Sequence, residues 1–164
     1  MNSFFSRSML IISLAAAIVV LAALLVGAWR LLNGGVDNSV TRVVSGPVTL
    51  GMGEQRFIPS DPLRFERQSS KILLHIDSAS DVDFSKQTIA LSDGSEHVIF
   101  VSVETASGKR YPLVPISMGS AIGFGFSDTD RQALSPSDAF VAVLVRADAP
   151  VPVSAIEWYS WIGK

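Results

Sequence analysis

Residues 96–115 read EHVIFVSVETASGKRYPLVP, and this stretch decides the fold class. Within residues 96–105, every second position lies on one face of a strand, and that face carries His97, Ile99, Val101 and Val103. Residues 106–108 form a turn that leads into residues 109–115. Alternation with period two around a short turn is typical of a β-hairpin, so the stretch predicts antiparallel β-structure.

The same pattern extends to both sides of this hairpin. We expect six further short strands, at residues 40–45, 47–52, 71–77, 121–127, 140–147 and 153–162. A single helical turn is expected over residues 127–134, capped by Ser127 or Asp128. The prolines of residues 148–152 place that connection outside a central ladder. Short strands separated by close turns predict an all-β antiparallel sandwich.

Two segments resemble galactose-binding-like jelly-roll domains. Residues 140–158, FVAVLVRADAPVPVSAIEW, resemble the closing strands of those domains, and residues 98–113 resemble their central hairpin. The likeness covers about half of the β-rich part and concerns its pattern, not a signature motif. It implies a jelly-roll-like sandwich that binds glycans or serves as an accessory module, and it assigns no binding residue.

An uninterrupted apolar run precedes the β-rich part. Residues 9–28 read MLIISLAAAIVVLAALLVGA and contain no charged side chain. About twenty helical residues span the roughly 30 Å hydrocarbon core of a bilayer. Trp29 and Arg30 then suit the headgroup region. We therefore expect residues 1–8 to be a cytoplasmic tail, residues 9–30 a single transmembrane α-helix, residues 31–39 a linker and residues 40–164 an extracytoplasmic β-domain.

A cleaved signal peptide is the alternative interpretation of this run, with a small-residue site at residues 26–28. The length favours the anchor, because the apolar region of a signal peptide usually spans about 7–15 residues. Within the anchor, Ala16, Ala23 and Gly27 share one helix face, where small side chains let a partner helix approach closely. We expect a single-pass protein of the bacterial inner membrane whose β-domain faces the periplasm.

Composition narrows the chemistry of the β-domain. The chain of 164 residues has no cysteine, which excludes a disulfide framework, a thiol nucleophile and Cys-based zinc sites. Its net charge is −2, so we expect no nucleic-acid partner. The acidic residues are better explained as solvated turn residues than as calcium ligands, because they lack the EF-hand spacing. These residues are Asp77, Asp81, Asp83, Asp93 and Glu96. We expect no metal and no cofactor.

The two histidines and the absence of hydrolase motifs favour binding over catalysis. We expect His97 to be a hydrogen-bonded structural residue on the apolar strand face, and His75 to lie on the surface. The sequence contains no Gly-x-Ser-x-Gly, His-Glu-x-x-His or Walker motif. We therefore expect that the protein is not an enzyme.

The last predicted strand carries the candidate binding residues. One face of residues 153–162 is expected to be core and carries Ile156, Trp158 and Ile162. The opposite face carries a carboxylate and two aromatic rings, from Glu157, Tyr159 and Trp161. Aromatic rings stack on sugars or fill protein interfaces, and a carboxylate accepts hydrogen bonds beside them.

These features predict a membrane-anchored accessory or assembly subunit of an envelope complex, which acts by binding protein partners. The first alternative is a membrane-tethered carbohydrate-binding module. The second is a small glycan-active hydrolase, which needs two carboxylates placed together in an open cleft.

Overall fold

The computed structural model describes residues 37–66 and 70–162, with side chains from residue 39 to residue 160 in these ranges. Strands dominate them. The strands of five residues or more are β1 (Asp37–Val44), β5 (Lys71–His75), β6 (Ala79–Asp83), β8 (Glu96–Thr105), β9 (Arg110–Met118), β10 (Ile122–Phe126), β11 (Ala139–Ala147) and β13 (Ala155–Ile162). The shorter strands are β2 (Val48–Leu50), β3 (Gln55–Phe57), β4 (Leu63–Arg64), β7 (Thr88–Leu91) and β12 (Val151–Val153).

One large sheet contains most of these strands, in the order β1-β13-β5-β10-β9-β8-β11-β3. Every neighbouring pair from β13 to β3 is antiparallel. Strand β4 pairs with β11 beside β3, and β7 links β8 to β6, while β12 and β2 form a separate two-stranded ladder. The predicted antiparallel all-β fold is confirmed.

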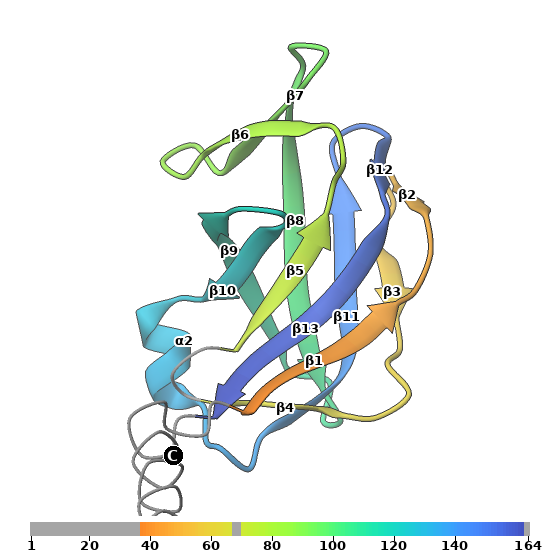
Figure 1. Cartoon of the computed structure of the whole chain (residues 1–164). Coiled ribbons are helices and arrows are strands. Elements are labelled where there is room, and N and C mark those ends of the chain that lie inside the picture. Colours follow the sequence, from red (N-terminus) through yellow and green to blue (C-terminus); the bar gives the residue numbers. More distant parts are fainter. Residues whose placement is uncertain (1–36, 67–69, 163–164) are drawn as a thin grey trace, which may run out of the picture. The chain divides into compact units, whose positions relative to one another are not determined.

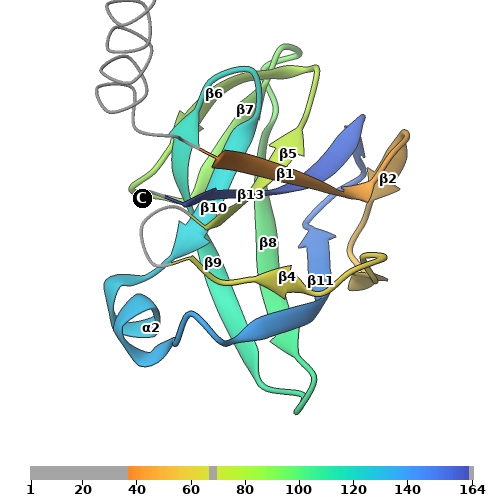
Figure 2. The same ribbon diagram turned by 60° about the horizontal axis from the view of Figure 1, so that its bottom comes forward.

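The sheet curls until it is nearly closed. Strand β9 joins the two parts of the sheet, because Leu113 pairs with Val101 of β8 and also with Phe126 of β10. The register of β10 against β9 also shifts between Gly123 and Phe124. Figure 1 shows β5, β13 and β1 side by side in front of β8 and β11, and Figure 2 shows β1 and β13 running across them. The two parts of the sheet therefore enclose one core.

An aromatic cluster occupies this core. The ring of Phe140 in β11 lies 5.7 Å from Trp158 in β13 and 5.5 Å from Phe126 in β10, measured between centroids. Phe126 is also 5.2 Å from Phe65 in an edge-to-face arrangement. Burial of each such side chain contributes about 1.5–3 kcal/mol, so these contacts hold the two parts of the sheet together.

Two glycines leave room on the outer face of β10. A Cβ atom at Gly123 would meet the hydroxyl of Ser117, and one at Gly125 would lie 2.6 Å from Cδ1 of Ile116. The side chains of β9 therefore fold over β10, which buries both glycines although they face outward.

The structure also corrects and extends the predicted elements. All eight predicted strands are present, and the predicted helical turn is α2 (Asp128–Ala133), whose N-cap Ser127 accepts a hydrogen bond from the Asp130 N–H. Strand β1 begins at Asp37 and not at residue 40, so the last residues of the predicted linker are strand. The proline connection contains β12, where Pro152 pairs with Thr49 outside the main sheet.

The remaining expectations for the N-terminal part fall on residues that the structure does not describe. These are the tail (1–8), the transmembrane anchor (9–30), the linker up to residue 36 and the helix-packing face of Ala16, Ala23 and Gly27.

Candidate functional site

The outer face of β13 carries the binding residues predicted from the sequence. Ile156 and Trp158 are buried in the core, whereas Glu157 and Tyr159 are half-buried on the outside, as the alternation predicts. Trp161 belongs to β13, but its side chain lies outside the described part of the chain. The structure thus places two of the three predicted residues next to each other on one face.

Both predicted side chains contact cations of this same chain. The Oε2 atom of Glu157 is 3.0 Å from Nε2 of His75, and its Oε1 atom is 3.5 Å from Nε of Arg42. The ammonium of Lys71 lies 5.1 Å from the centre of the Tyr159 ring. The carboxylate and the ring are therefore already engaged by neighbouring strands, and their role in ligand binding stays a prediction.

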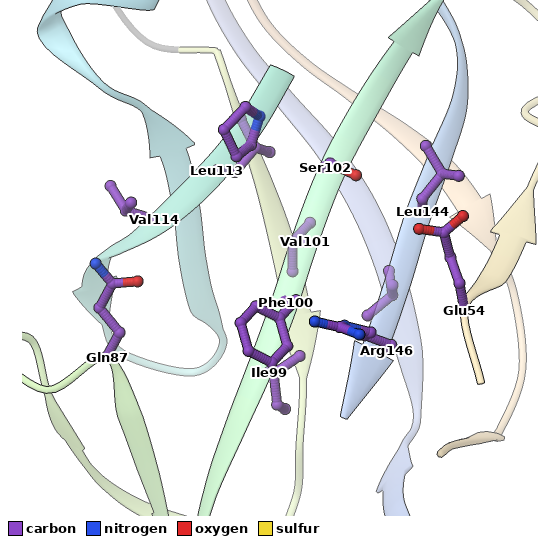
Figure 3. Close-up of a pocket in the computed structure, with 12 residues that line it drawn as sticks. Glu54, Gln87, Ile99, Phe100, Val101, Ser102, Leu113, Val114, Leu144 and Arg146 are labelled. Carbon is purple, nitrogen blue, oxygen red and sulfur yellow. The ribbon is translucent and has the colours of Figure 1, made fainter. Parts of the chain in front are cut away.

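A different outer face, formed by β9, β8 and β11, contains a groove of about 230 Å³ (Figure 3). The groove forms because successive outward-facing side chains project to different distances from the sheet. Small Ser102 is paired with Leu144 across β8 and β11, and Phe100 is paired with Arg146 in the next outward row. The Ser102–Leu144 pair therefore projects less from the sheet than the Phe100–Arg146 pair, and the groove lies over Ser102 and Leu144.

The Phe100–Arg146 pair consists of an aromatic ring with a cation stacked on it. The guanidinium carbon of Arg146 is 4.3 Å from the centre of the Phe100 ring, a cation–π contact. Phe100 nevertheless remains 49% exposed. Figure 3 shows the two side chains next to each other at one side of the groove, with Gln87 and Val114 across from Arg146.

A charged network lies on the other side of the Ser102–Leu144 pair, away from Phe100. Glu104, which is 8% exposed, accepts hydrogen bonds from Nη1 of Arg56 at 2.6 Å and from Nε of Arg110 at 3.1 Å. Arg110 also contacts Glu54 at 3.1 Å. The hydrogen bond from Arg56, joined by that from Arg110, lowers the pKa of the Glu104 carboxyl. This rim is therefore charged and fixed at neutral pH.

A second hollow of about 260 Å³ lies beside the same aromatic–cation pair. Met52, which is 78% exposed, borders it together with Phe100 and Arg146. The Ala147 N–H donates to the carbonyl of Gly51 at 2.8 Å, which holds the Met52 segment over the end of β11. Two hollows thus meet at Phe100 and Arg146.

Sequence reasoning missed this groove. The signal was present, because Phe100, Ser102 and Glu104 occupy the positions between the apolar ones and must face outward in the predicted strand. A large aromatic side chain at one outward position and a small side chain at the next outward position indicate a hollow beside the aromatic ring. The cross-strand partners Arg146 and Leu144 could not be predicted, because the register of β11 against β8 cannot be derived from the sequence pattern.

His97 forms a second polar cluster, at the turn before β8. Its Nδ1 atom is 3.1 Å from Oδ1 of Asp148 and its Nε2 atom is 3.0 Å from Oγ of Ser95, the connectivity of a serine-hydrolase triad. The Ser95 hydroxyl, however, donates to Oδ1 of Asp93 at 2.6 Å, and the Ser95 N–H donates to the same oxygen at 2.9 Å. Neither the hydroxyl proton nor the amide is thus available for nucleophile activation or oxyanion binding. His97 is hydrogen-bonded through both ring nitrogens, as expected, and its structural role stays a prediction.

The acidic turns bond to their own backbone. The Ser85 hydroxyl and the Lys86 N–H donate to the carboxylate of Asp83 and lower its pKa to about 2. The hydroxyl and the N–H of Ser95 likewise lower the pKa of Asp93. In the described ranges, no three His, Asp or Glu side chains are grouped so that they could hold a metal ion.

Comparison with known proteins yields no relative. No family model, curated protein or solved structure matches the chain. Across residues 37–66 and 70–162, no helix has the length and apolarity to span a membrane.

Proposed function

We propose that this chain is a single-pass protein of the bacterial inner membrane whose periplasmic β-domain acts by binding a protein partner, as an accessory or assembly subunit of an envelope complex. The proposal includes the jelly-roll-like arrangement of the sandwich. The apolar run of residues 9–28 supports the anchor.

One observation carries the binding role: a half-exposed Phe100 beside a groove on a rigid sheet. A single exposed apolar residue needs no explanation, because much of any protein surface is apolar. Here the ring coincides with a hollow on each side and with a stacked arginine. Phenylalanine and arginine are both enriched in protein interfaces, and arginine is among the residues that dominate their binding energy. The groove therefore supports a protein-binding surface.

Carbohydrate binding, the alternative function, would depend on the outward-facing Tyr159 ring and Glu157 carboxylate of β13. Sugar rings bind by stacking on an open aromatic face, and the Tyr159 ring already carries Lys71 over it. Glu157 is likewise paired with His75 and Arg42. A glycan would have to displace these contacts, so protein binding is the better-supported function.

Co-purification tests the binding role. The full chain is extracted from native membranes in mild detergent, and a stoichiometric partner is expected with it. Phe100→Ala should lower the amount of this partner at least about tenfold, as expected for a hot-spot aromatic. Phe84→Ala is the matched control, because Phe84 is 48% exposed and does not line the groove. A lone monomer, or equal loss in both variants, contradicts the proposal.

Alkaline washing tests the anchor. An uncleaved chain remains in the washed membrane with the mass of a protein that retains residues 9–28. A released chain that begins near residue 29 contradicts the anchor and supports the signal peptide.

A further inference from the structure

The site where the two hollows meet contains a cation, Arg146, that has no ion-pair partner among the side chains that the structure describes. Arg56 and Arg110 on the far rim both contact Glu104, and Arg110 also contacts Glu54. Asp148 borders the second hollow, but its carboxylate accepts from the Val98 N–H and contacts His97.

Arg146 differs from these groups. Across residues 39–66 and 70–160 it forms no ion pair, and its contact is the Phe100 ring. A guanidinium stacked on a ring keeps its edge N–H groups free, and these match the two oxygens of a carboxylate. The surface thus offers an apolar recess next to an unsatisfied cation.

The dimensions of the recesses favour one kind of occupant. Drug-sized ligands usually occupy pockets of about 300–1,000 Å³. The two hollows measure about 230 and 260 Å³ and are open at the surface. Each therefore suits one or two side chains of a larger molecule. An extended peptide places alternate side chains on one face, about 6.6–6.8 Å apart, so neighbouring subsites can be filled by one strand.

We infer that the groove binds an extended segment of the partner protein in which an apolar side chain enters a hollow beside Phe100 and a nearby carboxylate pairs with Arg146. This inference rests on the proposed function, since it names the chemistry of the partner at that same surface.

Photocrosslinking in native membranes tests the inference. A diazirine amino acid replaces Met52 in the full chain, because that side chain is 78% exposed at the edge of the second hollow. Replacement of Met118, which does not line either hollow, is the control. The expected product is a protein segment with an apolar residue and, within about two positions of it, Asp or Glu. Crosslinks to lipid only, to a second copy of this chain, to a segment without acidic residues, or to nothing overturn the inference.

Charge reversal then tests the pairing itself. Arg146→Glu should lower the crosslink yield at least tenfold, and Arg64→Glu, at an exposed cation on β4, should leave the yield unchanged. Replacement of the partner's acidic residue by Lys should restore the yield in the Arg146→Glu chain. A yield that Arg146→Glu does not change, or that the second replacement does not restore, overturns the inference.

Failure of the inference can be told apart from failure of the proposed function. If Phe100→Ala removes the partner while Arg146→Glu does not, the surface binds a protein but not through a carboxylate. If neither variant removes the partner, the groove is not the binding surface and the inference fails, whereas recovery of the unaltered chain without any partner makes the proposed function fail.

Discussion

The outer faces of β13 and β8 both carry aromatic and charged side chains, and they differ in what those side chains contact. On β13, Glu157 lies between His75 and Arg42, and Lys71 lies over Tyr159. On β8, Phe100 is half exposed at the meeting point of two hollows. Residue type alone therefore does not identify a binding surface, because cross-strand partners decide which groups remain available.

Both faces depend on one core, so the largest effect should come from that core. Phe140→Ala removes the ring that links β11 to Trp158 of β13, and it should lower the free energy of unfolding by about 3–5 kcal/mol. Urea titration of the full chain in mild detergent, followed by tryptophan fluorescence, measures this. Phe84→Ala should cost no more than about 0.5 kcal/mol, because its ring is on the surface. Equal costs would contradict the burial of Phe140 in a core shared by β11 and β13.

Strand β10 lies between the two faces in the order of the sheet, and its outward glycines let side chains of β9 pack closely over it. Gly123→Ala would place a Cβ against the Ser117 hydroxyl, which must rotate away, and we expect this to cost about 0.5–1.5 kcal/mol of stability. Gly119→Ala meets no atom within 4 Å and serves as the matched control. The same urea titration reports both values. A Gly123→Ala variant as stable as the control contradicts the close approach of β9 over β10.

The groove rim should lose stability in acid through Glu104. Because the pKa of Glu104 is lowered by Arg56 and Arg110, its carboxylate stabilises the fold fully above its ordinary pKa of 4.5. That stability is lost as the pH falls through the lowered pKa. Glu104→Gln should therefore be less stable than the natural chain at pH 7, and the difference should shrink below about pH 4.5. Melting temperatures across pH 7 to 3 measure this. A difference that does not depend on pH contradicts the ionised network.

The smallest effect is expected at the β13 face. Glu157→Gln breaks contacts to His75 and to Arg42, whose side chain is 71% exposed, so the loss of stability should be about 0–1 kcal/mol. Partner retention should not change. The urea titration and the co-purification assay test these two statements, and loss of the partner would restore the β13 face as a candidate site.

The sequence predicted the fold class and most strands of five residues or more because their signal is local, but it missed β6. Residues 96–105 alternate over the whole length of β8, and Ser127 marks the start of α2. The short strands β3 and β4 were missed because two or three residues carry no readable period. They form because β11 offers them a long edge, which is a tertiary effect.

The candidate site was predicted less well for a related reason. The orientation of Glu157 and Tyr159 follows from alternation within one strand and was predicted. Their partners Arg42, Lys71 and His75 come from other strands and depend on register. The groove depends on register even more, since it arises where Ser102 faces Leu144 beside the Phe100–Arg146 pair.

The most direct test of the account compares one aromatic from each face in the same assay. The full chain carrying Phe100→Ala or Tyr159→Ala is extracted from native membranes in mild detergent, and the amount of co-purified partner per chain is measured. We predict that Phe100→Ala loses the partner and that Tyr159→Ala retains it. Retention of the partner by Phe100→Ala, with or without its loss by Tyr159→Ala, would contradict the central claim that the groove on β8 is the binding surface.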